Sequence, residues 1–414
     1  MSLPGCVSGL VCVRCGRRYG RGLDSPCPAC GPEGVLEIEL DLARARRTLT
    51  PRALRSRPRT AWRYEELLPV PPRARRPALE PGWTPILAAP RLAQWVGVRQ
   101  LLVKDEGRNP TASFKDRASA VGVARALSRR AKVVACASTG NAATSLAGAA
   151  ASVGLPCVIF VPEFAPEPKV AQLLVFGARV FRVRGSYDAT WEMCQRACDR
   201  HAWYNRNAAV NPSLVEGKKT GGLEIAEQCG DEIPDWVAVS VGDGCTIAGI
   251  GKGLEEMKVL GFVPRVPRLL GVQAAGARPM VDAFTAGRDL VPGPAETMAD
   301  SISVGHPRNW RKALARVGAS GGAFVAVPDD AILEAQRETG RRAGLFGEPA
   351  AAAALAGLRR AVADGIVGRR QSALAVLTGS GLKDVRAALR AGRPVDLPPD
   401  DAALDDHLRE HPLG

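Results

Sequence analysis

The chain is organised around one nonapeptide, Asn109-Pro110-Thr111-Ala112-Ser113-Phe114-Lys115-Asp116-Arg117. A short apolar run at 101–103 precedes it, and a pattern typical of a helix begins near Ala118. Lys115 is therefore expected just past a turn, at the mouth of a helix. A helix N-terminus disfavours a cation, so a neutral or covalently tied lysine is easier to hold there. Such a lysine suits Schiff-base catalysis with an aldehyde cofactor, although an ordinary surface lysine would give the same local pattern.

Length and composition favour a protein of two or three domains. The chain has 414 residues, 46% of them hydrophobic, and a formal charge of 56 − 42 = +14. Such a charge suits nucleic acid or small anions as partners, but we interpret most of the scattered arginines as solvated helix faces. Arginines are dense only between Arg44 and Arg76. This run belongs to a basic, proline-rich linker or wrapping segment predicted at 36–82.

The N-terminus and the cysteine usage bear on location. The chain has 11 cysteines, several of them in apolar runs, which is the usage of a reduced compartment. The first ten residues lack a charged segment and a long apolar core, and no apolar run reaches membrane-spanning length. We therefore expect a cytoplasmic protein with no membrane partner.

Two cysteine pairs near the N-terminus have the spacing of a metal site. They are Cys12-Val13-Arg14-Cys15 and Cys27-Pro28-Ala29-Cys30, and a glycine follows each pair and relieves the tight turn. Four thiolates in two such pairs form a closed tetrahedral site that suits structural zinc and leaves no position for a substrate. We predict a zinc ribbon over residues 1–35, with Cys6 outside the pattern.

From residue 98 on, short apolar runs alternate with helical patterns. Alternation at this spacing predicts α/β units with largely parallel sheets. The expected division is a large domain at 83–115 and 205–395, a small domain at 116–204 and a tail at 396–414. Strands are predicted at 101–103, 133–137, 158–161, 180–183, 237–241, 269–272, 324–327 and 374–377, and helices at 118–128, 143–151, 187–199, 222–228, 247–260, 331–342 and 349–362.

Polar, glycine-rich turns end three of the predicted strands, the place where ligands collect in such sheets. The turn Ser138-Thr139-Gly140-Asn141-Ala142 offers hydroxyls, an amide and a helix N-terminus to an anion. The turn Gly242-Asp243-Gly244-Cys245-Thr246 has two glycines that let successive N–H groups point at one anion. The third turn runs from Thr378 to Asp384. Each alone is most simply a turn, but together with Lys115 they predict an active site.

Taken in order, these stretches resemble the threonine synthase family, which are pyridoxal-phosphate enzymes of fold type II. The resemblance covers the chain from about Trp83 to Asp384 and rests on the nonapeptide, the first turn and the third turn. The stretch 215–220 and the strand start at Asp235 also fit, and a cysteine-pair knuckle is familiar in one branch of the family. The resemblance implies two doubly wound domains with largely parallel sheets, a small zinc ribbon and a homodimer.

The resemblance also implies a role for each motif residue. Lys115 would bind the cofactor as an imine and later move protons, and Asn141 would donate to the cofactor's ring oxygen. Thr378 would face the pyridine nitrogen without supplying a full counter-charge, which favours elimination and replacement over transamination. The cofactor phosphate would be held by the backbone of Gly242, Asp243, Gly244, Cys245 and Thr246, and the substrate carboxylate by Ser138, Thr139, Gly140 and Ala142.

Four positions depart from the family pattern, which has polar residues and an arginine where this chain has apolar ones. An arginine–phosphate fork is a strong polar contact that leucine cannot replace. We therefore expect a less cationic substrate pocket, unless Arg117, Lys218 or Lys219 compensates. The four positions are Ala142, Ala208, Ala209 and Leu214.

Three functions stay open at this point. The first is threonine synthase activity, which removes an α-proton and a β-proton from O-phosphohomoserine, expels phosphate from Cγ and adds water at Cβ. The second is β-elimination or β-replacement on a serine-, threonine- or cysteine-like amino acid, with O-phosphohomoserine a poor substrate. The third is a zinc-knuckle nucleic-acid binder. With only Tyr19 as an aromatic residue between the cysteine pairs, the chain lacks a stacking platform, so we expect no nucleic-acid partner.

Overall fold

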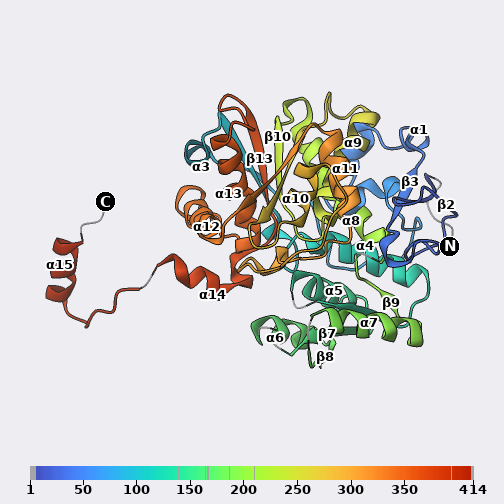
Figure 1. Ribbon diagram of the computed structural model, residues 1–414, viewed down its shortest axis with the longest axis horizontal. Helices are drawn as coiled ribbons and strands as arrows, with labels where there is room; N and C mark the ends of the chain where they lie inside the picture. The colour runs from blue at the N-terminus through green and yellow to red at the C-terminus, as the bar shows by residue number, and fades with distance from the viewer. Residues whose placement is uncertain are drawn as a thin grey trace.

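The computed structural model describes residues 6–138, 140–163, 165, 167–185, 187–208, 210–392 and 394–411, with the backbone alone at 167–169 and 187–188. Its described residues form a six-stranded sheet, a four-stranded sheet and a three-stranded sheet (Figure 1). The two larger sheets are parallel except at one edge strand, and helices cover their faces. The predicted α/β class with largely parallel sheets is confirmed.

The large sheet has the order β12-β11-β10-β13-β5-β4, with β4 antiparallel to β5. Alternate residues of β10 bury opposite faces: Ala238 packs on one side, and Val237 and Val239 on the other. Because both faces are covered, the strands are apolar throughout rather than alternating. The strands are β4 (Ile86–Ala88), β5 (Gln100–Asp105), β10 (Trp236–Ser240), β11 (Arg268–Ala274), β12 (Ala323–Val327) and β13 (Ser372–Leu377).

The helices that cover the large sheet separate into two groups according to the face they bury. Helices α3 (Pro90–Val96), α12 (Asp329–Ala343) and α13 (Pro349–Ala363) pack with Ala238. Helices α8 (Ser213–Cys229), α9 (Cys245–Leu260), α10 (Pro279–Ala286) and α11 (Trp310–Ala319) pack with Val237 and Val239.

The small sheet has the order β8-β7-β6-β9 and is parallel throughout. Val134 and Cys136 of β6 face one cluster of helices, and Ala135 and Ala137 face the other. Its strands are β6 (Val134–Ala137), β7 (Cys157–Pro162), β8 (Arg179–Val183) and β9 (Tyr204–Asn205), and its helices are α4 (Lys115–Ser128), α5 (Asn141–Ala151) and α6 (Glu167–Val175) on one face and α7 (Tyr187–His201) on the other.

The N-terminal segment forms an antiparallel sheet, β2-β1-β3, of β1 (Val7–Cys12), β2 (Arg18–Tyr19) and β3 (Leu36–Leu40). The chain then continues through α1 (Leu42–Ala45), α2 (Pro51–Ser56) and the 3-10 helix η2 (Ala61–Leu67). Leu49, Leu54 and Tyr64 are buried in the same core cluster as α8 and α9. Residues 41–67 therefore wrap the large sheet's helices; the division into domains stays a prediction.

Most of the predicted elements are present, but two helix starts are wrong. All eight predicted strands exist with slightly different ends, whereas α4 begins at Lys115 and α8 begins at Ser213, well before residue 222. Helix α8 is buried along nearly its whole length, so it lacks the one-sided apolar period by which a helix is recognised. The sequence did not predict several other elements, among them β4, β9, α3 and α11.

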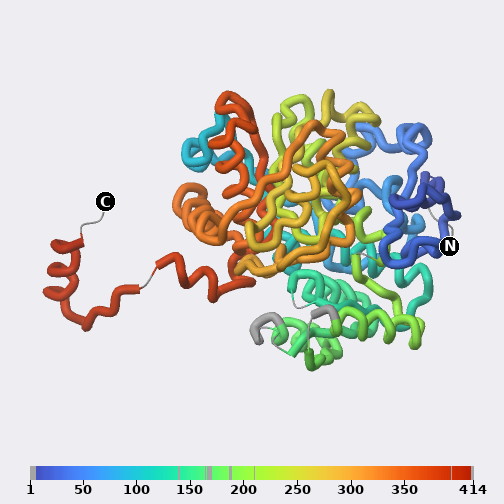
Figure 2. Tube along the Cα trace, in the orientation of Figure 1, coloured from blue at the N-terminus to red at the C-terminus, as the bar shows by residue number. Residues whose placement is uncertain are grey.

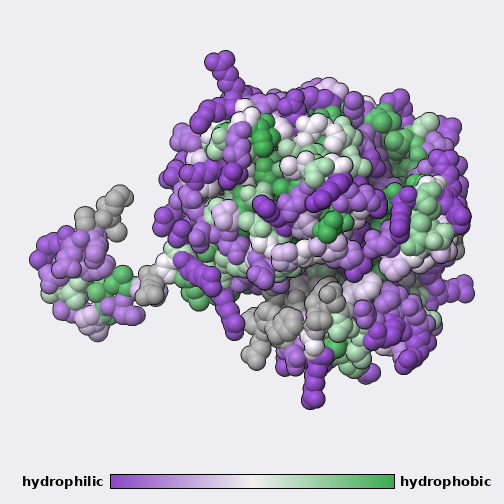
Figure 3. Space-filling model, in the orientation of Figure 1, coloured by the Kyte–Doolittle hydropathy of each residue, from purple (hydrophilic) through white to green (hydrophobic). Residues whose placement is uncertain are grey.

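The C-terminal residues leave the body after α14 (Val385–Ala388). Helix α15 (Asp401–Glu410) stands clear of the rest of the molecule in Figures 1 and 2. The face seen in Figure 3 is mostly hydrophilic, in keeping with the many charged residues. Among the described residues, no helix combines the length and the apolar character that crossing a bilayer requires.

Candidate active site

A cavity of about 810 Å³ opens where the N-termini of α4, α5 and α9 meet. Lys115, Asn141 and Cys245 are the first residues of these three helices. The structure thus brings the nonapeptide and all three glycine-rich turns to one place. Thr139, one of the predicted residues, lies outside the described part of the chain. The other predicted residues that line the cavity are Ser138, Gly140, Ala142, Gly242, Asp243, Gly244, Thr246 and Thr378.

Backbone pairing with the turn after β13 fixes the loop that carries Lys115. The Phe114 N–H donates to the Thr378 carbonyl oxygen at 2.8 Å, and the Ser380 N–H donates to the Ala112 carbonyl oxygen at 3.1 Å. Ala112 has a φ of 61°, in the left-handed region that an alanine rarely adopts. Lys115 and Thr378 therefore lie together because their two loops are hydrogen-bonded to each other.

The surroundings of Lys115 favour the neutral form of its amine. Burial, together with the positive charges of Lys218 and Arg206, lowers the pKa of Lys115 to about 8. Desolvation and like charges both disfavour an ammonium ion. Near neutral pH a much larger fraction of this amine is therefore uncharged than in an ordinary lysine, as a nucleophilic lysine requires.

The turn Gly242-Asp243-Gly244 packs tightly on its outer side and exposes backbone to the cavity. Gly244 has a φ of 86°, and a Cβ there would lie 2.9 Å from the Met280 side chain. The Asp243 carboxylate accepts hydrogen bonds from the Arg308 N–H at 2.6 Å and from the Cys245 thiol at 3.0 Å. Its negative charge is thus occupied by these donors. The first N–H groups of α9, for which the helix itself has no acceptors, lie at the cavity and can bind an anion.

The side chain of Asn141 is held by a carboxylate that the sequence reading missed. Its Nδ2 donates to Oε1 of Glu348 at 2.8 Å. The Glu348 N–H in turn donates to the carbonyl oxygen of Gly379, beside Thr378, at 3.0 Å. Asn141 is therefore positioned against the same turn as Lys115, although Glu348 comes from the start of α13.

Several cations line the cavity despite the apolar residue at Leu214. Of the three that the sequence suggested, only Lys218 reaches it: Arg117 and Lys219 are buried in ion pairs elsewhere. The sequence reading missed Arg206 because it follows β9, a strand of two residues that shows no pattern. It also missed His306 and Arg308, which come from a loop without a strand before it.

Comparison with known proteins assigns the family. The model of a family described as "Pyridoxal-phosphate dependent enzyme" matches residues 78–379. The chain is 38% identical over 404 residues to the threonine synthase of Methanocaldococcus jannaschii. The alignment covers 96% of this chain and 99% of that protein. It is 37% identical to the threonine synthase of Mycobacterium leprae over 82% of this chain and 92% of that protein. The chain belongs to the pyridoxal-phosphate-dependent enzymes.

The fold agrees with this family. The structure of threonine deaminase isoform 2 from Solanum lycopersicum superimposes with a TM-score of 0.64 at 23% identity, over 74% of this chain and 86% of that one. The two doubly wound sheets are those of a fold type II pyridoxal-phosphate enzyme. The cavity fits the cofactor chemically, because it combines a lysine amine of lowered pKa, a glycine-rich turn at a helix N-terminus and a neutral Thr378 hydroxyl.

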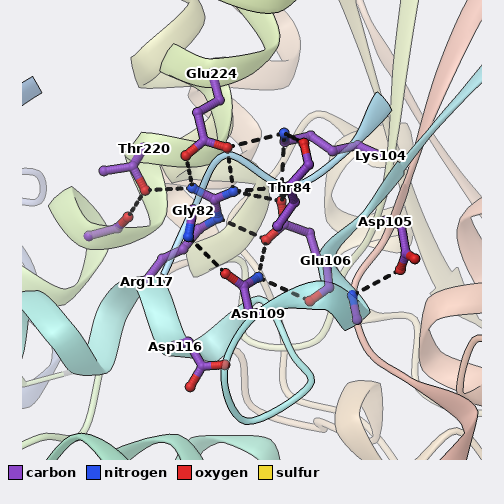
Figure 4. A network of polar contacts seen from close by, with 12 residues as sticks. Gly82, Thr84, Lys104, Asp105, Glu106, Asn109, Asp116, Arg117, Thr220 and Glu224 are labelled. Atoms are coloured by element: carbon purple, nitrogen blue, oxygen red, sulfur yellow. Dashed lines mark hydrogen bonds and ion pairs between the residues drawn. The ribbon is translucent and has the colours of Figure 1, made fainter. Parts of the chain in front are cut away.

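A buried ion network anchors the enzyme's lysine loop to its neighbours (Figure 4). Arg117, two residues past Lys115 and fully buried, forms bidentate pairs with Glu106 and Glu224, with distances of 2.7–2.8 Å. Lys104 of β5 lies 3.1 Å from Glu224. Burial alone would raise the pKa of Glu224, but Arg117 and Lys104 lower it to about 2. The network therefore ties α4, β5 and α8 together through charges that have no access to water.

Removing Arg117 should destabilise the enzyme strongly. Arg117→Ala leaves Glu106 and Glu224 buried without their partner, which costs about 3–5 kcal/mol in the free energy of unfolding. Denaturant unfolding followed by circular dichroism measures this change. The control is Arg360→Ala, since Arg360 pairs with Asp364 at the surface and an exposed pair is worth at most about 1 kcal/mol. Equal losses in the two variants would contradict the role given to the network.

Proposed function

We propose that the enzyme converts O-phosphohomoserine and water to threonine and phosphate. The observation that carries this proposal is the near full-length similarity to threonine synthases, at 38% identity over 96% of the chain. The cavity supports it, because Arg206, Lys218 and Arg308 supply positive charge for a phosphorylated substrate. A homodimer and a cytoplasmic location remain predictions.

The roles that we propose combine the chemistry of the family with the residues that line the cavity. Bound pyridoxal phosphate would supply an electron sink that makes the substrate's α-proton acidic. Lys115 would hold the cofactor and, once released, take and return protons, since its lowered pKa matches that task. Asn141, fixed by Glu348, would donate to the ring oxygen, and Thr378 would face the ring nitrogen. The N–H groups at 242–246 would hold the cofactor phosphate, and residues 138–142 the substrate carboxylate.

The second reading, elimination or replacement on another amino acid, is not favoured. It rested on four apolar positions, of which Leu214 was the most telling because the family pattern places an arginine there. Leu214 is fully buried, and a Cβ at Gly122 of α4 would lie 2.7 Å from its Cδ2 atom. Leu214 thus fills a helix–helix contact, while the positive charge of the cavity comes from other residues. The expectation that O-phosphohomoserine is a poor substrate is therefore withdrawn.

Steady-state kinetics with a panel of amino acids tests the proposal. The panel consists of O-phosphohomoserine, O-phosphoserine, serine, threonine and cysteine. We expect threonine and phosphate in equal amounts from O-phosphohomoserine, and a much higher kcat/KM for it than for the other four. Efficient turnover of serine, threonine or cysteine with no threonine formed from O-phosphohomoserine would sink the proposal and restore the second reading.

We infer that the cysteine cluster holds one zinc ion. The four Sγ atoms of Cys12, Cys15, Cys27 and Cys30 all lie within 4.8 Å of one another, and those of Cys15 and Cys27 are 3.9 Å apart. Sulfurs around a tetrahedral zinc, each about 2.3 Å from the metal, stand roughly 3.8 Å apart. A site closed by four thiolates is structural rather than catalytic.

The inferred zinc site also fits the contacts between the ribbon and the body. Asp24, between the two cysteine pairs, pairs with Arg125 at 3.1 Å and with Arg129 at 2.9 Å, both on α4. On the other side of the ribbon, the ammonium of Lys252 donates to the Ile38 carbonyl oxygen at 2.5 Å. The ribbon therefore packs against α4 and α9, and the metal would hold its two cysteine turns in place.

Elemental analysis should find one zinc ion per chain in protein prepared under reducing conditions without chelator. Cys27→Ser should lose the metal and lower the hydrogen-exchange protection of residues 6–40 more than that of the large sheet, because so small a segment has little core of its own. Cys229→Ser, which removes a thiol outside the cluster, is the control and should keep the metal. Wild-type protein without zinc would rule the site out.

A further inference from the structure

We propose that Lys218 is the cation that binds a phosphate monoester in the active-site cavity. Lys218 lies on α8 and lines the cavity, yet it is only 3% exposed. Within the described residues its ammonium has neither a hydrogen-bond acceptor nor a carboxylate partner. This phosphate could belong to the substrate or to the cofactor. A role toward the substrate rests on the proposed function, whereas a role toward the cofactor rests only on membership of the family.

Lys218 differs from the other deeply buried lysines of the described chain. Each of those has a carboxylate within 3.2 Å: Lys104 has Glu224, Lys219 and Lys252 both have Glu216, and Lys312 has Glu37. A buried charge without a partner is costly. A lysine buried to this degree in an open cavity is therefore best explained by an anionic ligand that completes its surroundings.

The position of Lys218 is set by close packing of α8 on α9. A Cβ added at Gly249 would lie 2.9 Å from the Lys218 Cβ, so the two helices approach with little space between them. After burial, the Lys218 charge is the next cause that lowers the pKa of Lys115, and it also opposes the rise in the pKa of Cys245. Its ammonium thus acts on the N-termini of both α4 and α9.

The surroundings select a doubly charged anion. The N-termini of α4 and α9 add to the positive potential of this part of the cavity. The guanidinium of Arg206 adds to it as well, and it donates to the Ser119 hydroxyl at 3.0 Å. Lys218 also lies four residues after Leu214 on the same face of α8, one helical turn from the position where a phosphate-binding arginine was expected. A phosphate monoester carries the charge that this arrangement lacks, and it has two sources: the cofactor and the substrate.

The central variant is Lys218→Gln, which removes the charge and keeps the length. If Lys218 binds the substrate phosphate, the KM for O-phosphohomoserine and the Kd of inorganic phosphate for the holoenzyme should both rise about 10- to 100-fold, as expected for a lost charge-assisted contact. The Kd of pyridoxal phosphate for the apoenzyme should stay unchanged. If Lys218 binds the cofactor phosphate, that Kd should rise by the same factor while the Kd of pyridoxal, which has no phosphate, does not.

Two further variants make the result specific. Lys218→Arg keeps the charge and should restore most of the lost affinity. Lys258→Gln makes the same change in net charge at an exposed position of α9, and it should leave every constant unchanged. The proposal would be overturned if every KM and Kd of Lys218→Gln stayed within about twofold of the value for Lys258→Gln.

The test stays decisive if one arm fails. The two binding measurements need no turnover, so they still probe Lys218 if O-phosphohomoserine proves not to be the substrate. If Lys218→Gln does not fold, the wild-type protein still offers a result that would contradict the proposal. A holoenzyme that does not bind inorganic phosphate, together with an apoenzyme that binds pyridoxal as tightly as pyridoxal phosphate, would contradict the proposal.

Discussion

The two bidentate ion pairs of Arg117 are the interaction on which the site depends. Its guanidinium bridges Glu106, the residue after β5, to Glu224 on α8. Lys115 precedes Arg117 by two residues on α4, and Lys218 precedes Glu224 by six residues on α8. One buried contact thus sets the lysine expected to hold the cofactor relative to the lysine that we assign to phosphate. Because bidentate pairs have little angular freedom, the two helices hold a defined register where the chemistry takes place.

Positive charge then accumulates at the cavity. Three helix N-termini, Lys115, Arg206 and Lys218 all face one space of about 810 Å³. The mutual repulsion of these charges, added to burial, explains why the pKa of Lys115 falls to about 8. The same charge supports the proposal that an anionic cofactor and an anionic substrate bind here, because both would relieve the repulsion. The lowered pKa of Lys115 and the proposed anion binding therefore have one electrostatic cause.

The sequence predicted those parts of the fold and site that depend on local pattern. All eight apolar strand runs and the three glycine-rich turns are where they were expected, because buried strands and tight turns have strong local signals. Glu348, Arg206 and Arg308 were missed, because each reaches the cavity from an element that shows no functional motif. The pocket was expected to be less cationic because four aligned positions are apolar, and sequence distance could not tell which of Arg117, Lys218 and Lys219 would reach it. The cation at Lys218 becomes evident once α8 is seen to begin at Ser213 and to turn that residue toward the cavity.

The most direct test of this account is to find which residue binds the cofactor. Holoenzyme reduced with borohydride should carry the added mass of reduced pyridoxal phosphate on the tryptic peptide that contains Lys115, with none on the peptide that contains Lys218. Lys115→Ala should abolish the label, while Lys258→Gln should keep it. Stoichiometric label on any other lysine, or a label that persists in Lys115→Ala, would contradict the central claim that the lysine at the start of α4 is the cofactor's anchor.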